Sequence, residues 1–158
     1  MITKNKPMKR LFTIAILLVC WNMAHSQFVI TMEVDEPING VCDNDKIYAI
    51  FPMIEGQQEA ICPVSKDAIL KRLNNDVEFL KDKPKYKDKG MIGLIINCKG
   101  ELVKCEMDNK TQSTELDKQI EDVFKSLGEW KAGKLNGNDV DSSKLYSFKI
   151  KKGKFTFD

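Results

Sequence analysis

The stretch Met91–Met107, which reads MIGLIINCKGELVKCEM, decides the fold of this chain. Two β-rich runs, Met91–Asn97 and Glu101–Met107, flank the dipeptide Lys99-Gly100. This pattern is typical of a β-hairpin closed by a two-residue turn. It therefore predicts two antiparallel strands.

The predicted register gives the hairpin one apolar face. Ile96 faces Val103 in this register, and Leu94 faces Cys105. Successive side chains of a strand point to opposite sides, so the alternating pattern identifies the side that meets the core. The residues on that side are Ile92, Leu94, Ile96, Val103, Cys105 and Met107. Glu101, close to the turn, is the polar exception on this face.

Amphipathic helices are predicted before and after the hairpin. Ser65 is a candidate N-cap for a helix over residues 66–81, and a second helix begins at Thr114. Gly128 follows the second helix where a C-terminal cap belongs. The apolar residues at helical spacing are Ile69, Leu73, Val77 and Leu80 in the first helix, and Leu116, Ile120, Val123, Phe124 and Leu127 in the second.

The end of the chain supplies the remaining strands. Leu145–Ile150 is rich in β-forming residues, and Phe155–Phe157 extends it after a turn at Lys152-Gly153. Residues 65–158 thus predict an α+β domain of two layers, with an antiparallel sheet of about three main strands packed against two helices. Residues 27–64 predict a β-hairpin extension packed on this sheet, with strands over 28–34, 46–54 and 58–63.

Residues 1–26 follow the pattern of a secretory signal peptide. A basic start precedes an apolar run of about fourteen residues, and Ala24-His25-Ser26 provides the small residues that signal peptidase requires. We expect cleavage after Ser26 and export to the periplasm. Three alternatives stay open: an extracellular location, lipidation at Cys20, and retention of the segment as a membrane anchor.

Removal of this segment changes the charge of the protein. Four of the 25 basic residues and none of the 23 acidic residues lie in 1–26, so the net charge moves from +2 to 21 − 23 = −2. We expect no nucleic-acid partner, because such a surface needs basic residues massed on one face. The lysine-rich stretch 81–89, interrupted by Asp82 and Asp88, is interpreted as a solvated loop.

Four cysteines follow the signal segment: Cys42, Cys62, Cys98 and Cys105. An even number in an exported domain indicates two disulfides, and three pairings are open. The hairpin register separates Cys98 from Cys105 by on the order of 13 Å, beyond the reach of a disulfide. We favour a Cys42–Cys62 bond, with crossed pairs between the early segment and the hairpin as the alternative.

Catalytic and metal-binding patterns are missing from the sequence. The single histidine, His25, lies in the signal segment, so a Ser-His-Asp or Cys-His arrangement is not expected. The cysteine spacing contains no CxxC pair of the kind found in zinc sites and thiol oxidoreductases. We therefore expect a protein that is not an enzyme and that holds no cofactor and no metal.

The second half of the chain resembles the TonB C-terminal domain family, in the form common in Bacteroidetes. The resemblance is carried by the hairpin Ile95–Val103, the helix start Glu115-Leu116-Asp117 and the segment Trp130–Val140. Family members show a hairpin glycine, a leucine–aspartate pair at the helix start, and a Trp-x-Pro-Gly segment after the helix. This chain departs from the pattern because Ala132 replaces the proline and a long proline-rich arm is missing.

The resemblance implies a way of binding. TonB C-terminal domains offer a sheet edge to an extended peptide, which adds as a further strand. The implied docking edge in this chain consists of Leu145, Tyr146, Ser147, Phe148, Lys149 and Ile150. The implied partner is a segment of an envelope or outer-membrane transport protein. The alternative is a small disulfide-stabilised secreted protein with a structural or inhibitor-like role.

Overall fold

The computed structural model describes residues 28–32 and 36–157, so the predicted signal peptide lies outside the described residues. In chain order, the elements are β1 (Ile30–Met32), β2 (Ile47–Ala49), β3 (Gln57–Gln58), α2 (Lys66–Asp76), the short 3-10 helix η1 (Glu78–Leu80), β4 (Asp88–Ile96), β5 (Leu102–Asn109), α3 (Thr114–Lys125), β6 (Gly133–Leu135), β7 (Asn138–Val140), β8 (Ser142–Lys151) and β9 (Lys154–Phe157). Within these ranges, the helices are too short or too polar to cross a membrane.

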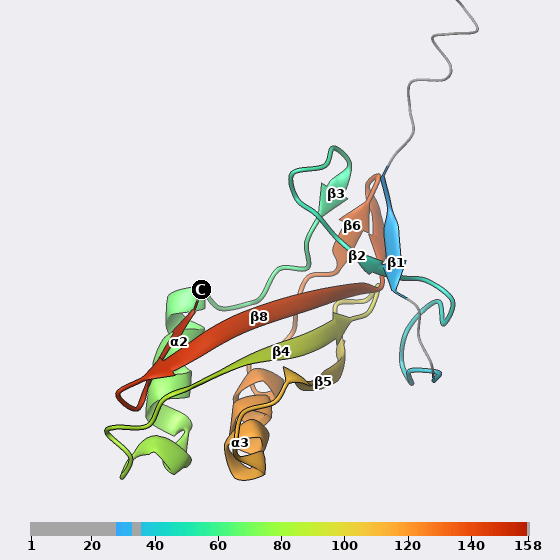
Figure 1. The fold of residues 1–158 in the computed structure, drawn as a ribbon. Helices are drawn as coiled ribbons and strands as arrows, with labels where there is room; N and C mark the ends of the chain where they lie inside the picture. Colours follow the sequence, from blue (N-terminus) through green and yellow to red (C-terminus); the bar gives the residue numbers. More distant parts are fainter. Residues whose placement is uncertain (1–27, 33–35, 158) are drawn as a thin grey trace, which may run out of the picture.

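The α+β class is confirmed, but the sheet is larger than predicted and is mixed. Its strand order is β1-β2-β8-β4-β5, with β9 also paired to β8 (Figure 1). The central strands β8, β4 and β5 are antiparallel neighbours, whereas β2 runs parallel to β8. A second, small sheet joins β3, β6 and β7. The predicted antiparallel arrangement thus describes the three central strands, whereas the parallel addition of β2 and the second sheet were not predicted.

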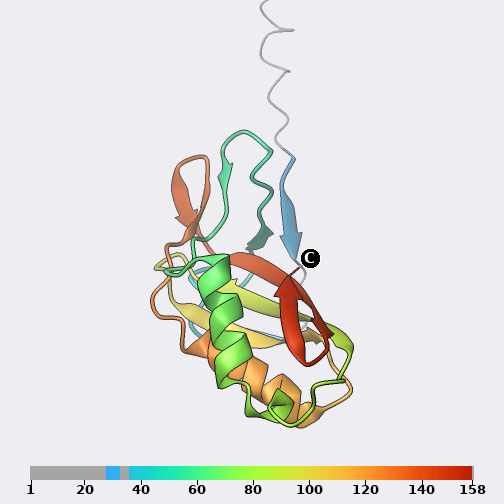
Figure 2. The same cartoon turned by 90° about the vertical axis from the view of Figure 1, so that its left-hand side faces the viewer.

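The two helices lie on one face of the main sheet (Figure 2). Their apolar stripes fall where the sequence predicts them, since Ile69, Leu73, Ile120 and Phe124 are fully buried. Each helix has a serine N-cap: the Oγ of Ser65 accepts from Ala68, and the Oγ of Ser113 accepts from Leu116. Helix α3 thus begins after Ser113, and α2 ends at residue 76, earlier than expected.

The β4–β5 hairpin confirms the predicted register in its middle and departs from it at the turn. Leu94 faces Cys105 as expected, but Ile96 faces Leu102 instead of Val103. The cause is Gly100, whose φ of +84° places it in the left-handed region. The turn is a three-residue loop, closed by the N–H of Asn97 donating to the carbonyl of Glu101. Leu102 therefore packs against the core in place of Val103.

The early segment, described over 28–32 and 36–64, adds β1 and β2 to the main sheet, but its later part does not return along β2. Strand β1 pairs antiparallel with β2, at Ile30 opposite Ala49 and Met32 opposite Ile47. The segment 58–63 was expected to return along 46–54. Instead, β3 pairs with β6, and Ile61 forms a bridge with Lys131. This region is tied to the second half of the chain at several points.

Candidate functional site

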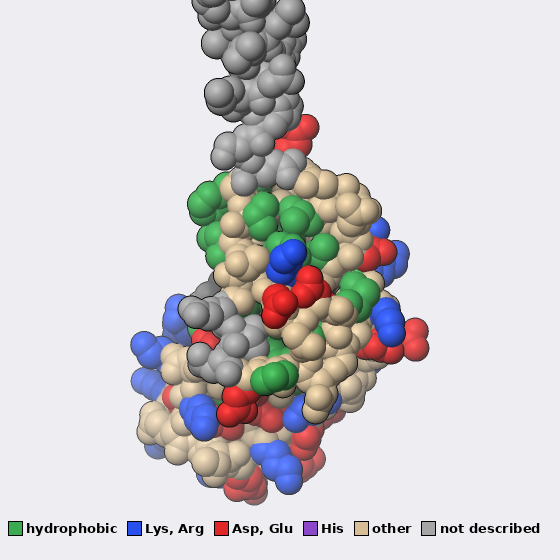
Figure 3. Space-filling view, turned by 90° about the vertical axis from the view of Figure 1, so that its right-hand side faces the viewer, with side chains coloured by type: hydrophobic (Ala, Val, Ile, Leu, Met, Phe, Trp, Pro, Cys, Tyr) green, Lys and Arg blue, Asp and Glu red, His purple; other side chains and the backbone are tan. Residues whose placement is uncertain are grey.

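An exposed group of large apolar side chains lies along the β1 end of the sheet. It consists of Phe28, Ile30, Met32, Phe51 and Met53, and we call it the apolar edge. The exposed fractions range from 37% for Ile30 to 97% for Met53, although such side chains are normally buried. Figure 3 shows apolar side chains gathered on the upper part of this face, above a more strongly charged region.

Strand β1 stands at the end of the strand order, so within the described residues it has a strand neighbour on one side only. Native proteins usually protect such an edge with charged residues, proline or a bulge. The segment Phe28–Met32 contains neither a charge nor a proline. Its backbone therefore offers a place where another extended chain could pair.

The buried amide of Gln57 holds the two aromatic residues of the apolar edge. Its Nε2 donates to the carbonyl of Phe28 over 2.7 Å, and its Oε1 accepts from the N–H of Phe51 over 2.9 Å. The rings of Phe28 and Phe51 lie 6.5 Å apart between centroids, within aromatic contact. Gln57 is only 5% exposed, so a buried side chain thus holds the backbone of the two exposed aromatic residues in place.

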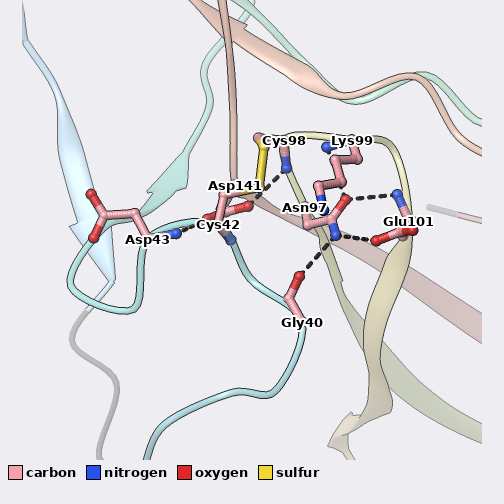
Figure 4. Close-up of a disulfide and its surroundings, with 8 residues drawn as sticks. All are labelled: Gly40, Cys42, Asp43, Asn97, Cys98, Lys99, Glu101 and Asp141. Atoms are coloured by element: carbon pink, nitrogen blue, oxygen red, sulfur yellow. Dashed lines mark hydrogen bonds between the residues drawn. A yellow bond between two sulfur atoms is a disulfide. The ribbon is translucent and has the colours of Figure 1, made fainter.

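A buried carboxylate anchors the loop before β2 to the rest of the domain (Figure 4). The Oδ2 of Asp141 accepts from the N–H groups of Cys42 and Asp43, over 2.8 and 2.7 Å. Its Oδ1 accepts from the N–H of Cys98 over 2.8 Å. Three backbone donors therefore compensate the burial of one charged side chain, which is 2% exposed.

The amide of Asn97 adds a second link between the same loop and the hairpin turn. Its Nδ2 donates to the carbonyl of Gly40 and to the carboxylate of Glu101. Its Oδ1 accepts from the N–H groups of Lys99 and Glu101, which fixes the turn itself (Figure 4). Asn97 is fully buried and has its polar atoms paired, so its role is structural.

The disulfide in this anchor corrects the predicted pairing. Cys42 is bonded to Cys98, so the favoured Cys42–Cys62 bond was wrong and a crossed pair is present. The loop approaches the hairpin because Asp141 holds both Cys42 and Cys98, a long-range arrangement with no local sequence signal. The exclusion of a Cys98–Cys105 bond agrees with the free thiol of Cys105.

Cys62 and Cys105 are free thiols in partly buried positions. Burial raises the pKa of Cys105 from its ordinary value of 9.0 to about 12, and burial also raises the pKa of Cys62. The reactive form of cysteine is the thiolate, which these shifts disfavour. The two thiols therefore lack the environment of a nucleophile.

The side chains of Cys42, Cys98 and Asp141 lie close enough together for metal ligands. However, the two sulfur atoms are bonded to each other, and both oxygens of Asp141 already accept hydrogen bonds. The group therefore acts as a covalent and polar anchor for the loop.

The predicted docking edge lies on β8, in the middle of the sheet. Strand β4 pairs with one side of β8 along nearly its whole length. On the other side, β2 pairs with residues 142–143 and β9 with residues 148–151. Phe148, Lys149 and Ile150 are thus covered by β9, and the prediction of a free edge there was wrong. Among the described strands, only residues 144–147 lack a partner on that side.

A hollow of about 250 Å³ opens over this short gap, lined by Lys66, Leu145, Tyr146, Ser147 and Phe157. Four residues of β8 span about 13 Å, which leaves room for very few ladder hydrogen bonds. The predicted docking residues are thus brought together only in part, and β1 offers the more open edge. The sequence signal for β1 was its uncharged run of β-forming residues.

Comparisons of this chain with protein-family models, curated proteins and solved structures find no match. The resemblance to the TonB C-terminal domain therefore stays a prediction from the sequence.

Proposed function

We propose that this protein is a non-enzymatic interaction module, exported to the periplasm, that binds an extended segment of another envelope protein. The segment adds to the main sheet as a strand beside β1, and its side chains pack against the apolar edge. The observation that carries this proposal is the outermost position of β1 together with the exposure of Phe28, Ile30 and Met32.

The charge around the apolar edge favours one type of partner. The described part of the early segment, 28–32 and 36–64, contains five acidic residues and a single lysine, Lys46. An extended segment with apolar residues in its middle and basic residues at its ends would complement this surface in both respects. Backbone hydrogen bonds would supply affinity, and the apolar side chains would select the partner.

The anchor described above supports this role. Strand addition requires an edge that is already in place, because a disordered edge loses more entropy when it binds. The disulfide Cys42–Cys98 and the carboxylate of Asp141 fasten the loop that leads into β2, which in turn holds β1. The resemblance to TonB C-terminal domains implies the same mode of binding, although on the last main strand.

NMR titration of the oxidised, isotope-labelled protein tests this proposal. The probe is a ten-residue peptide of alternating valine and threonine with two lysines at each end. We expect saturable shifts at residues 28–32 and 51–53. Ile30→Lys should weaken binding at least tenfold, because it places a repelling charge in the contact. Ile61→Lys, at an exposed apolar position bridged to Lys131, is the matched control and should leave the affinity unchanged.

Shifts confined to residues 144–147, with no loss of affinity in Ile30→Lys, would place docking on β8 and reject the apolar edge. A stable dimer that buries β1 and excludes the peptide would also contradict the proposal. An absence of shifts at millimolar peptide would remove its support, and the small disulfide-stabilised secreted protein would then be the better interpretation.

A further inference from the structure

Two lysine-rich segments that are far apart in the sequence meet at one end of the molecule. The loop 81–89 contacts the tip of the β8–β9 hairpin, where the N–H of Gly153 donates to the carbonyl of Tyr86 over 3.0 Å. Figures 1 and 2 both show the loop and the hairpin tip side by side. Their lysines, all exposed, are Lys81, Lys83, Lys85, Lys87, Lys89, Lys149, Lys151, Lys152 and Lys154. We call this group the lysine end.

The lysine end concentrates positive charge on a protein whose net charge is negative. The two segments 81–89 and 149–154 contain nine lysines and two aspartates, so their net charge is 9 − 2 = +7. The expected mature chain carries −2, and the rest of it therefore carries −9. The fold thus collects at one end a charge that the sequence distributes over two distant segments.

The strand register places like charges opposite each other at this end. Lys89 faces Lys149 in the β4–β8 ladder, and Lys151 faces Lys154 across the β8–β9 turn. Like charges in facing positions destabilise a sheet. The carboxylate of Asp88 accepts from Tyr86 and from the N–H groups of Lys89 and Gln112, so several neutral donors share it.

A hollow of about 430 Å³ lies at the centre of the lysine end, between the end of α2, η1 and the hairpin tip. Lys81, Lys152 and Lys154 line it, together with the buried apolar side chains of Val77 and Leu80. Lys152 has a φ of +54°, which is unusual for a residue with a side chain. Three lysines thus border a partly apolar hollow, and the ammonium group of one of them, Lys81, also forms an exposed ion pair with Glu78.

We propose that the lysine end binds clustered phosphate groups, with this hollow as the centre of the site. Lysine presents a compact charge with three rotatable donors and binds phosphate as a point charge, without the planar fork that favours arginine. The apolar side chains of the hollow suit the part of a ligand that carries the phosphates. Two sources share this chemistry: the headgroups of an anionic lipid surface and soluble polyphosphates.

Two binding measurements on the oxidised protein distinguish the sources. NMR titration with tripolyphosphate reports binding of the soluble anion, with shifts expected at residues 81 and 152–154. Co-sedimentation uses vesicles of 70% phosphatidylcholine and 30% phosphatidylglycerol, with pure phosphatidylcholine as the neutral reference. Binding to either anionic probe, weakened at least tenfold when salt rises from 0.05 to 0.5 M, supports the proposal and identifies the source.

A matched pair of variants tests the site itself. One variant combines Lys81→Gln, Lys152→Asn and Lys154→Gln, with asparagine chosen because it tolerates a positive φ. The control combines Lys110→Gln, Lys118→Gln and Lys131→Gln, three exposed lysines outside the lysine end with the same change in net charge. We expect at least a tenfold loss of affinity in the first variant and less than a twofold loss in the control.

An equal loss in the two variants would show that only net charge matters and would overturn the site. Absence of binding to both tripolyphosphate and anionic vesicles would overturn the proposal entirely. Far-ultraviolet circular dichroism confirms that each variant is folded before its affinity is interpreted. Ile30→Lys, in the apolar edge, should leave phosphate binding unchanged. Failure of peptide binding and failure of phosphate binding can therefore be told apart.

Discussion

Asp141 is the residue on which the attachment of the early segment depends most directly. Its Oδ2 accepts from the N–H groups of Cys42 and Asp43, and its Oδ1 accepts from the N–H of Cys98. An asparagine amide, in either orientation, would place its NH₂ group against at least one of these N–H donors. Asp141→Asn should therefore lower the free energy of unfolding by about 2–4 kcal/mol. Urea denaturation of the oxidised protein measures this loss.

Asp139 provides the control for that measurement. It lies two residues earlier and forms an exposed ion pair with Lys134. Asp139→Asn should cost about 0–1 kcal/mol, because exposed ion pairs contribute little. Equal losses in the two variants would mean that the buried hydrogen bonds of Asp141 contribute no more than a surface charge.

The buried thiol of Cys105 should be slow to react in the folded protein. Burial raises its pKa from 9.0 to about 12, so the thiolate fraction at pH 8 is far smaller than that of an ordinary cysteine. We expect iodoacetamide to modify Cys105 at least a hundredfold more slowly in the folded protein than in urea, as measured by peptide mapping. Rapid modification of Cys105 in the folded state would contradict this expectation.

The same shift makes stability depend on pH in the alkaline range. The unfolded thiol ionises from about pH 9, whereas the folded thiol keeps its proton up to about pH 12. The unfolded state therefore binds fewer protons in this window, and stability falls as the pH rises through it. Cys105→Ala should reduce this alkaline slope without removing the contributions of other groups.

At the scale of elements, the β4–β5 turn depends on the left-handed conformation of Gly100. A Cβ at this position would lie 2.2 Å from the carbonyl oxygen of Trp130, which is a backbone atom. Gly100→Ala should therefore cost at least about 3 kcal/mol, from backbone strain and the displacement of the segment at Trp130. Gly137 has a similar φ of +82° but open space around it.

Gly137→Ala is thus a control that isolates the cost of the backbone conformation, and it should lose only about 1 kcal/mol. Thermal unfolding of the two variants measures the difference. If Gly100→Ala lowered the stability no more than Gly137→Ala, the contact between the turn and Trp130 would be looser than the structure describes.

The same elements show which features of the fold local sequence patterns can predict. Apolar periodicity predicted both helix faces and the middle of the hairpin, because these depend on neighbours along the chain. The pairing of Ile96 was missed because Gly100 lengthens the turn by one residue. The covering of β8 was missed because β9 folds back along its end and β2 joins its start in parallel from almost a hundred residues away. The Cys42–Cys98 bond was missed because it joins residues 56 positions apart.

At the scale of the whole molecule, β8 connects two surfaces of opposite character. The residues at its start pair with β2, which carries β1 and the apolar edge, and the hairpin at its end carries part of the lysine end. Its ten residues span roughly 30 Å. The acidic early segment and the basic hairpin tip are thus held at a distance by one rigid strand.

Removal of the disulfide should therefore loosen one end of the molecule selectively. The bond joins residues 56 positions apart, so its loss should lower the free energy of unfolding by about 4 kcal/mol in the chain-entropy estimate. The ladder between β4 and β8 and the core beneath it do not include either cysteine. The variant Cys42→Ser/Cys98→Ser should consequently keep this ladder protected while β1 and β2 exchange their amide hydrogens faster.

Hydrogen–deuterium exchange measured by mass spectrometry distinguishes local loosening from global weakening. A hundredfold faster exchange in residues 28–32 and 47–49, with little change in β4 under native conditions, would show that the early segment opens as a separate unit. The variant should then bind the extended peptide more weakly but keep its affinity for phosphate. If instead all strands exchanged faster to the same extent, the two ends would form one cooperative unit and the disulfide would stabilise both surfaces together.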